Sequence, residues 1–149
     1  ILSQNKEINI IIPMHKNPII NKTFLENLGK ENSVKLLEPF SYDVMVKILS
    51  DCYCLLTDSG GLQEEAPSLG IPVLLLRDTS ERMEGVKSGN VKIIGTDPEN
   101  IYLQSNELIN NPTLHREMSR INNPYGDGLA SKRIVSIIKD WFNNELFEK

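Results

Sequence analysis

The sequence predicts an α/β fold with a doubly wound parallel sheet, and two observations support this prediction. Five short runs rich in Val, Ile and Leu alternate with helical patterns along the chain. Continuous apolar runs of this kind are typical of parallel strands, whose two faces are both covered by helices. The length of 149 residues, of which 40% are hydrophobic and 24% charged, suits one globular domain of this class.

Strands are expected where an apolar, β-branched run lies between turn-forming residues. Pro13 stops the first such run, and Pro39 follows the second. By this criterion the expected strands are 8–12, 34–37, 52–56, 72–76 and 91–94.

Helices are expected where apolar residues recur at helical spacing between capping residues. Pro18 opens the first helix, 18–28, and Gly29 closes it. Ser41 is a candidate cap for the second helix, whose apolar stripe is Val44, Ile48 and Leu49. The other expected helices are 62–69, which Gly70 ends, then 98–109, 112–119 and 129–146. The last of these has one apolar face, made of Ile134, Ile137, Ile138, Trp141 and Phe142.

Charge and hydropathy exclude two classes of partner. The chain has 16 Lys and Arg residues against 20 Asp and Glu, a formal net charge of −4. A nucleic-acid-binding face would be basic, so we expect no nucleic-acid partner. No apolar run approaches the ~18–20 residues that span a bilayer, and residues 1–7 do not resemble a signal peptide. We expect a cytoplasmic protein without a membrane partner, and, because it begins with Ile1, a piece of a longer chain.

The two cysteines predict neither a disulfide nor a metal site. Cys52 and Cys54 are one residue apart, so on a strand they would share a face but lie too far apart to bridge easily. No second pair of cysteines and no pair of histidines occurs at zinc-binding spacing. We therefore expect both thiols to be reduced and buried, and no metal or other cofactor.

The strongest candidate site is the segment 57–65, which lies between an expected strand and the following helix. Gly60 and Gly61 leave space for backbone N–H groups to approach an anion, and Ser59 adds a hydroxyl. Glu65, farther into the helix, could accept hydrogen bonds from the two hydroxyls of a ribose, whereas Glu64 faces about 100° away. This arrangement suits a diphosphate. The alternative is an ordinary helix N-terminus with Ser and Asp caps.

Two further polar segments follow the ends of expected strands, where ligands bind in such sheets. His15 follows the first strand and could carry a proton or steady a departing phosphate. Arg82 follows the fourth and could contact phosphate or sugar, with a surface ion-pair network as the alternative. We expect Arg77 and Asp78 to hold their loop in shape.

The remaining polar segments are expected to be structural. Residues 123–128 are rich in turn formers, with Asp127 as a candidate cap for the last helix. His115 has polar neighbours and is expected on the solvated surface.

Five segments of the sequence together form a recognisable pattern: 57–73 (TDSGGLQEEAPSLGIPV), 15–18 (HKNP), 81–82 (ER), 95–97 (GTD) and 123–128 (NPYGDG). In this pattern the chain resembles the non-hydrolysing bacterial UDP-N-acetylglucosamine 2-epimerases. The resemblance covers nearly the whole chain but only the carboxy-terminal half of the family. It implies a Rossmann-like domain spanning 1–149, one half of a glycosyltransferase-B arrangement whose amino-terminal domain is absent.

The resemblance also implies a function. The family interconverts UDP-GlcNAc and UDP-ManNAc without metal or nicotinamide, by eliminating UDP and adding it back with C2 inverted. By the match, His15 would contact the reacting ligand, Ser59, Gly60 and Gly61 the diphosphate, Glu65 the ribose, and Arg82 the phosphate–sugar region. Phe40 and Met45 would line the uracil pocket.

Two departures from the family pattern bear on this match. Met83 stands where the family usually has proline after the Glu-Arg pair, and Met45 stands where an aromatic residue is frequent. The loop that holds Arg82 is therefore expected to be less rigid than in the family. Met45 can still pack against the face of a base.

The acid–base carboxylates of the family belong to its amino-terminal domain, so we expect this chain to bind UDP and to be inactive alone. The resemblance further implies a homodimer in the full-length protein, a role in surface polysaccharide synthesis, and a last helix that crosses to the missing domain. The alternatives are a non-catalytic nucleotide-sugar binding module, the donor-binding half of a UDP-sugar glycosyltransferase, and a hydrolysing epimerase.

Overall fold

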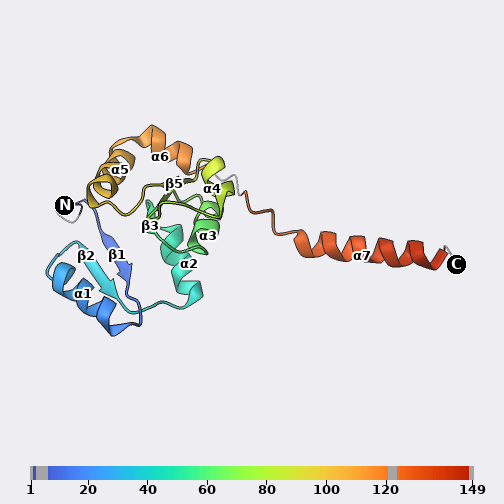
Figure 1. The fold of residues 1–149 in the computed structure, drawn as a ribbon, viewed down its shortest axis with the longest axis horizontal. Helices are drawn as coiled ribbons and strands as arrows, with labels where there is room; N and C mark the ends of the chain where they lie inside the picture. The colour runs from blue at the N-terminus through green and yellow to red at the C-terminus, as the bar shows by residue number, and fades with distance from the viewer. Residues whose placement is uncertain (1, 3–6, 121–123, 148–149) are drawn as a thin grey trace.

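The computed structural model describes residues 2, 7–120 and 124–147, in which parallel strands alternate with helices (Figure 1). The strands are β1 (Ile10–Pro13), β2 (Val34–Leu37), β3 (Leu55–Thr57), β4 (Val73–Leu75) and β5 (Val91–Ile93). The helices are α1 (Pro18–Leu28), α2 (Tyr42–Ser50), α3 (Leu62–Ser68), α4 (Met83–Lys87), α5 (Pro98–Asn110), α6 (Pro112–Met118) and α7 (Ala130–Phe147). The α/β class is confirmed.

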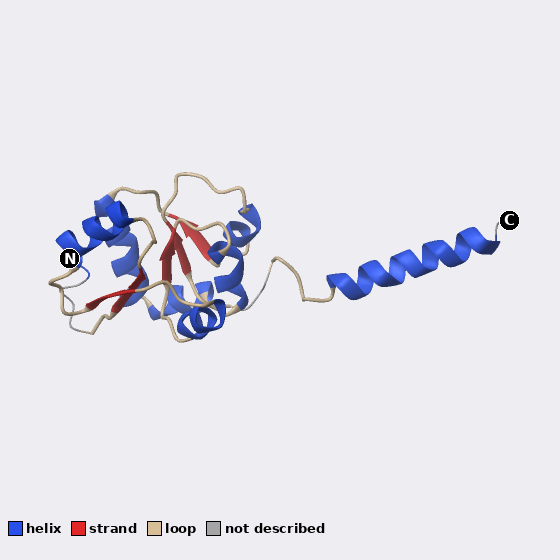
Figure 2. Ribbon diagram, turned by 90° about the horizontal axis from the view of Figure 1, so that it is seen from below, coloured by secondary structure: helices blue, strands red, loops and turns tan. Residues whose placement is uncertain are grey.

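The strands form two parallel sheets rather than the single sheet expected from the sequence (Figure 2). β1 pairs with β2, and β3, β4 and β5 form the other sheet with β4 in the middle. The strand expected at 52–56 begins only at Leu55, because the Cys52 N–H donates to the Leu49 carbonyl at 2.9 Å and extends the end of α2. β3 is therefore only three residues long, and within the described residues it does not pair with β1.

The core lies on both faces of the three-stranded sheet. Val73 and Leu75 of β4 pack with Ala66 and Val91 on the face that α3 covers. Leu74 points to the opposite face, where it packs with buried residues of the α5 and α6 region, Ile94, Leu108 and Met118. All three residues of β4 are completely buried. This is the doubly wound packing that the continuous apolar run predicts.

The pair of strands β1 and β2 with α1 forms a more exposed unit. Val34 is buried, but α1 has no buried residue and its Ile19 is 76% exposed. An apolar pocket of about 350 Å³ lies between this unit and α5, lined by Leu2, Ile10, Ile12, Leu28, Val34, Pro98, Ile101 and Tyr102. This unit therefore lies beside α5 with an apolar pocket between them.

The two cysteines are free and half-buried, but they do not share a face. Cys52 packs against the core on the α3 side and Cys54 against the core on the α5 side. The expectation of one shared face is wrong because residues 52–54 are not part of a strand. Burial raises the pKa of both thiols, that of Cys54 to about 11.

His115 is also not the solvated surface residue expected from its neighbours. Its ring stacks on Tyr53 with centroids 3.8 Å apart, and its Nε2 lies 2.9 Å from the Tyr53 carbonyl oxygen. The Tyr53 hydroxyl in turn donates to the Leu108 carbonyl at 3.3 Å. Tyr53 therefore ties the segment before β3 to α5 and α6, a link between residues far apart in the sequence.

A buried asparagine, Asn90, links the start of β5 to the end of α6. The Asn90 side-chain amide is 1% exposed and donates to the carbonyls of Met118 at 2.7 Å and Arg120 at 2.8 Å. Its oxygen accepts from the Ser88 hydroxyl at 2.8 Å. Asn90 thus satisfies carbonyl groups at the end of α6 that the helix itself leaves without partners.

α7 extends away from the rest of the molecule (Figure 1). Its expected apolar face is present but exposed, with Ile137 66%, Trp141 54% and Phe142 56% accessible. Just before the helix, Asp127 accepts from the Leu129 N–H at 3.0 Å and forms a two-pronged ion pair with Arg133. Asp127 therefore organises the start of the helix, as its sequence position predicts.

Asparagine and aspartate side chains cap three of the described helices. Asn17, Asp97 and Asn111 each accept a backbone N–H at the start of α1, α5 and α6. Ser41 occupies the expected cap position of α2 but makes no capping hydrogen bond; its side chain bonds to Asp43 instead and lowers the pKa of that carboxyl. The short helix α4 was not expected.

Candidate functional site

The candidate site is built on two loops that follow neighbouring strands. Residues 57–61, here the Ser59 loop, join β3 to α3, and residues 76–82, here the Arg82 loop, join β4 to α4. β3 and β4 are adjacent and parallel, so both loops leave the same end of the sheet. The convergence expected from the sequence is therefore present for these two segments.

The Ser59 loop begins at a buried threonine. Thr57 is the last residue of β3, is 7% exposed, and its hydroxyl accepts the Ser59 N–H at 3.0 Å. Neither Gly60 nor Gly61 takes a positive φ, so their conformation alone does not require glycine. What the two glycines provide is space beside the backbone.

Arg82 occupies the space beside Gly60. A β-carbon on Gly60 would lie 3.1 Å from Nη1 and 3.2 Å from Cζ of the Arg82 guanidinium. The Arg82 guanidinium and the backbone of the Ser59 loop thus meet at Gly60, although they come from segments more than twenty residues apart.

Two carboxylates hold this guanidinium. Arg82 Nε donates to Glu64 Oε1 and Arg82 Nη1 to Glu81 Oε1. The hydrogen bond that Arg82 donates to Glu64 is the main reason that the pKa of Arg82 is raised. Glu81 has a lowered pKa, first because of its own backbone N–H and then because of Arg82 and Arg77. Glu64 therefore has a structural part as the partner of Arg82.

Arg77 ties the two loops together, beyond the expected role of shaping its own loop. Its Nε donates to the Asp58 carbonyl at 2.6 Å, and its Nη1 lies 3.4 Å from Glu81 Oε2. Asp78 lies beside Gly95, where a β-carbon would be 3.2 Å from its Oδ1. Both residues shape the Arg82 loop.

Two residues of the site were missed by the sequence analysis, Gln63 and Ser80. Gln63 is completely buried, and it bridges the Ser59 carbonyl and the Ser80 hydroxyl. The sequence feature that could have identified Gln63 is a polar residue at a helix position that faces the core, one turn before the buried Ala66 and Pro67.

The other predicted site residues lie in three places, at the start of α3, after β1 and around α2. Glu65 lies in the first turn of α3 and is half-buried, and among residues 7–120 and 124–147 its carboxylate has no hydrogen-bond or ion-pair partner. His15 is exposed after β1, and its Nδ1 accepts the Asn17 N–H at 3.1 Å. Phe40 precedes α2 and Met45 lies within it, both half-buried.

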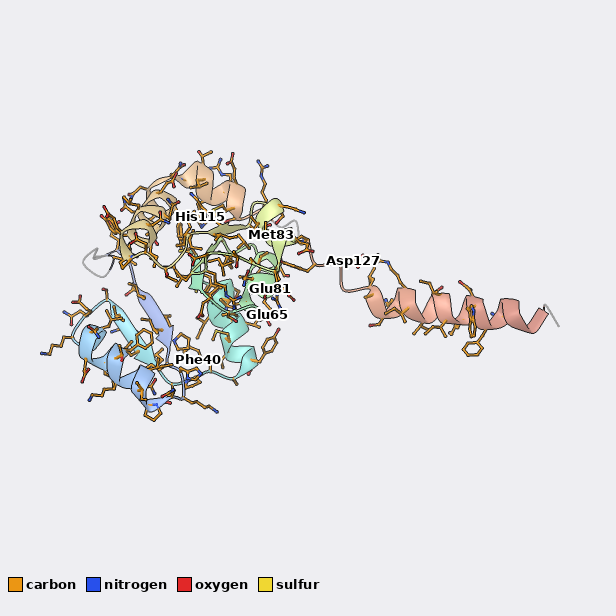
Figure 3. All side chains as sticks on the ribbon, in the orientation of Figure 1. Phe40, Glu65, Glu81, Met83, His115 and Asp127 are labelled. Carbon is orange, nitrogen blue, oxygen red and sulfur yellow. The ribbon has the colours of Figure 1, made fainter. Side chains whose placement is uncertain are left out.

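The structure does not bring all of these residues together. Phe40 lies apart from Glu65 and Glu81, on the side of the molecule that holds β1, β2 and α1 (Figure 3). Within the part of the chain that the structure describes, no hydrogen bond or ion pair links His15, Phe40 or Met45 to the Ser59 loop. The observed cluster is therefore the Ser59 loop, Arg82 and the start of α3.

The turn-rich segment before α7 lies against the same region. The Tyr125 hydroxyl accepts the Gly85 N–H of α4 at 3.1 Å, and burial is the main reason that the pKa of Tyr125 is raised. Asn123, part of the same predicted segment, lies outside the described residues. The contact favours the structural interpretation of this segment.

Two negative findings concern the described residues only. They contain no group of three or more His, Cys, Asp or Glu side chains placed to hold a metal ion. None of their helices combines the length and apolar character needed to cross a membrane.

Comparison with known proteins identifies the family. Residues 1–139 match the family model described as UDP-N-acetylglucosamine 2-epimerase. The chain is 44% identical to the enzyme of that name from Bacillus subtilis (strain 168), over 91% of this chain and 36% of the relative. It is 41% identical to that of Escherichia coli (strain K12), over 94% of this chain and 37% of the relative. The chain thus spans little more than a third of these curated relatives.

Solved structures agree in fold as well as in sequence. S. aureus MnaA in a co-structure with UDP superposes with a TM-score of 0.89 at 43% identity, over 95% of this chain and 39% of that one. The Neisseria meningitidis UDP-GlcNAc 2-epimerase bound to UDP-GlcNAc gives a TM-score of 0.83 at 45% identity, over 89% and 36%. The parallel α/β fold and the match over nearly its whole length show that this chain belongs to the UDP-N-acetylglucosamine 2-epimerase family.

Proposed function

We propose that this chain is the UDP-binding half of a UDP-GlcNAc 2-epimerase, an isomerase that interconverts UDP-GlcNAc and UDP-ManNAc. The observation that carries the proposal is the contact between the Arg82 guanidinium and Gly60, at the loop that ends β3. It supports a site where a cation and backbone N–H groups face one anion. The co-structures of relatives with UDP and UDP-GlcNAc support a nucleoside diphosphate as that anion.

In this proposal the diphosphate lies on the Ser59 loop. Ser59 offers its hydroxyl, since its own N–H already donates to the Thr57 hydroxyl, and Gly60 and Gly61 offer their backbone N–H groups. Arg82 exchanges a carboxylate partner for a phosphate oxygen. Glu65 accepts hydrogen bonds from the ribose hydroxyls, which suits a half-buried carboxylate without a partner among the described residues. Glu65 and Arg82 thus fix the two ends of the ribose–phosphate unit.

The remaining contacts come from the other part of the molecule. Phe40 and Met45 hold the uracil ring, and His15 contacts the reacting sugar side of the diphosphate, where it acts in catalysis as UDP departs and returns. The half-buried surfaces of Phe40 and Met45 suit an apolar contact with a base. Phe40 lies apart from Glu65 and Glu81 (Figure 3), which suits an extended ligand such as a nucleotide sugar.

The reaction needs a second domain. Elimination of UDP requires removal of the proton at C2, and its carboxylate acid–base groups belong to the amino-terminal domain in this proposal. The chain alone therefore binds UDP without isomerising the sugar. The full-length protein is a cytoplasmic homodimer with a role in polysaccharide synthesis, in which α7 crosses to the amino-terminal domain.

Calorimetric titration with UDP tests the proposal. We expect saturable binding of UDP but not of ADP, because the uracil contacts are specific. Ser59→Ala and Glu65→Ala should each weaken binding by about 1–3 kcal/mol, the loss of a charge-assisted hydrogen bond. Ser68→Ala, on the exposed side of the same helix, and Glu26→Ala on α1 are the matched controls. A folded chain that does not bind UDP overturns the proposal.

A further inference from the structure

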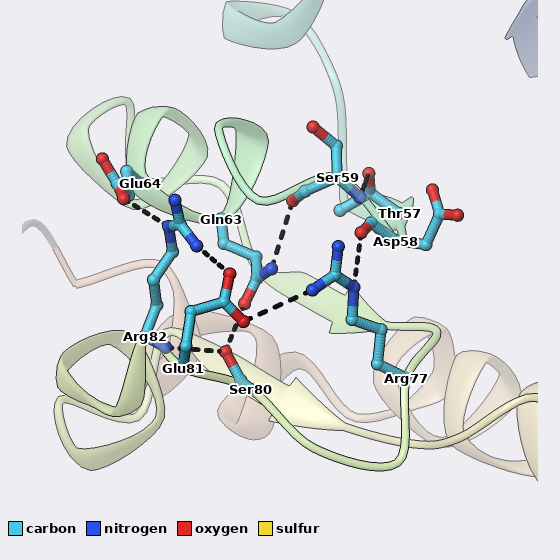
Figure 4. A network of polar contacts seen from close by, with 9 residues as sticks. All are labelled: Thr57, Asp58, Ser59, Gln63, Glu64, Arg77, Ser80, Glu81 and Arg82. Carbon is cyan, nitrogen blue, oxygen red and sulfur yellow. Dashed lines mark hydrogen bonds and ion pairs between the residues drawn. The ribbon is translucent and has the colours of Figure 1, made fainter.

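A chain of hydrogen bonds runs beneath the candidate site and joins its two loops (Figure 4). Gln63 Nε2 donates to the Ser59 carbonyl at 3.2 Å, and the Ser80 hydroxyl donates to Gln63 Oε1 at 2.7 Å. The Arg82 backbone N–H donates to the Ser80 hydroxyl at 3.0 Å. The Ser59 carbonyl is thus connected to the Arg82 backbone through two side chains.

The burial of Gln63 distinguishes these hydrogen bonds from an ordinary network on the protein surface. Its side chain is 0% exposed, in a helix whose other buried residues are Ala66 and Pro67. A buried amide is tolerated only when its polar atoms are bonded, and an apolar side chain of the same size would fill the position without that requirement. The value of an amide here lies in the geometry that its two bonds impose on the loops.

We propose that Gln63 and Ser80 are positioning residues that set the spacing between the Ser59 loop and Arg82, so that both meet the diphosphate at the same time. The inference rests on the proposed function, in which this cluster binds the diphosphate of UDP. Neither side chain touches the ligand in this arrangement. Gln63 acts through the Ser59 backbone and Ser80 through the Arg82 backbone.

A second tie keeps the loops connected when this chain of bonds is broken. Arg77 Nε donates to the Asp58 carbonyl at 2.6 Å on the more exposed side of the same two loops. Loss of the Gln63–Ser80 bond therefore shifts the loops relative to one another without separating them. The β3–β4–β5 core, which holds the strands on which both loops are built, is untouched.

The test compares UDP with uridine, because only UDP carries the phosphates that the two loops would share. The variants are Gln63→Met, which keeps the size of the side chain, and Ser80→Ala. Each should bind UDP about tenfold more weakly than the unmodified chain, because both variants lose the Gln63–Ser80 bond that links the two loops. Uridine affinity, measured by chemical-shift titration, should stay unchanged.

Additional variants separate positioning from general destabilisation. The double variant should bind UDP no more weakly than either single variant, because both changes break the same chain of bonds. Ser80→Thr keeps the hydroxyl and should bind UDP within about twofold of the unmodified chain. Ser68→Ala, a serine of α3 whose hydroxyl is exposed, should leave both affinities unchanged.

The outcomes distinguish this inference from the proposed function. If UDP binds the unmodified chain and both folded variants equally well, Gln63 and Ser80 do not position the site and the inference is wrong. A parallel loss of UDP and uridine affinity also overturns it, since that indicates damage to the whole fold. If the unmodified chain does not bind UDP, the proposed function itself fails. Should Gln63→Met not fold, Ser80→Ala and Ser80→Thr decide the question.

Discussion

The guanidinium of Arg82 lies against the α-carbon of Gly60, so closely that a β-carbon there would be 3.1–3.3 Å from three of its atoms. This relationship explains why the loop after β3 contains glycine at a position whose φ any residue could adopt. The missing side chain lets two loops of the same sheet meet. It also makes the position sensitive to the smallest substitution.

Gly60→Ala should displace the Arg82 side chain while the fold is kept. The added methyl group meets the far end of a flexible side chain, so we expect the free energy of unfolding to change by less than about 1 kcal/mol. The Arg82 Nε–H resonance, which reports the bond to Glu64, should shift. Heteronuclear NMR and chemical denaturation measure the two effects. Gly61→Ala is the matched control, because a β-carbon there would have nothing within 4 Å.

Gly85→Ala should destabilise the fold. A β-carbon at this buried position of α4 would lie 2.7 Å from the Tyr125 hydroxyl and 2.8 Å from Cγ2 of Val91 in the core. Overpacking of this kind costs about 1–3 kcal/mol, only partly offset by the higher helix propensity of alanine. Urea denaturation measures the loss. Adding Tyr125→Phe removes one of the two close contacts and should restore part of it; an unchanged midpoint for Gly85→Ala alone would contradict the prediction.

Asn90→Ala should be among the more harmful polar substitutions in the chain. It removes the amide that satisfies the Met118 and Arg120 carbonyls, so the free energy of unfolding should fall by about 2 kcal/mol. Asn27→Ala removes an exposed amide bonded to the Thr23 carbonyl and should cost less than about 0.5 kcal/mol. Thermal denaturation of both variants is the measurement, and equal losses would contradict a special role of Asn90.

Alkaline pH should weaken the fold through Cys54. Burial raises the pKa of this thiol from 9.0 to about 11, so between these values the folded chain retains a proton that the unfolded chain has released. Stability is therefore complete below pH 9 and is lost as pH rises towards 11. Cys54 should contribute a loss of about 2 kcal/mol at pH 11. Unfolding at pH 8 and pH 11 measures this loss, and Cys54→Ala should show a smaller decrease.

Local patterns in the sequence predict much of this fold. The bounds of α1 and β2 agree with the structure, because proline, glycine and a short apolar run mark them without help from distant residues. Pro13, expected to stop the first strand, is its last residue. The helix α4 was missed because five residues that include Gly85 are too few to show a helical period.

The errors arise where distant contacts decide. Residues 52–54 have the composition of a strand, but the Cys52 bond to Leu49 at the end of α2 and the stacking of Tyr53 on His115 hold them in another conformation. Tyr53 and His115 are 62 residues apart, so no local pattern contains their contact. The Cys52 and Cys54 side chains consequently pack against different parts of the core.

The candidate site was predictable to a similar degree. The rule that loops converge at the carboxyl ends of parallel strands correctly brings the Ser59 loop and Arg82 together. The pairing of Arg82 with Glu64 depends on the orientation of α3 in three dimensions, which the sequence does not reveal. The placement of His15, Phe40 and Met45 depends on how the two sheets pack, and their roles remain predictions.

The exposed position of Trp141 on α7 has a practical consequence for anyone who studies this chain by fluorescence. It is the only tryptophan in the sequence, and it stands on a helix that extends away from the β3–β4–β5 core (Figure 1). Its emission should resemble that of the indole ring in water and should change little when the core melts or when a nucleotide binds. The same emission should move to shorter wavelength when another surface covers the helix, so the chain carries a built-in optical reporter for docking at α7 alone.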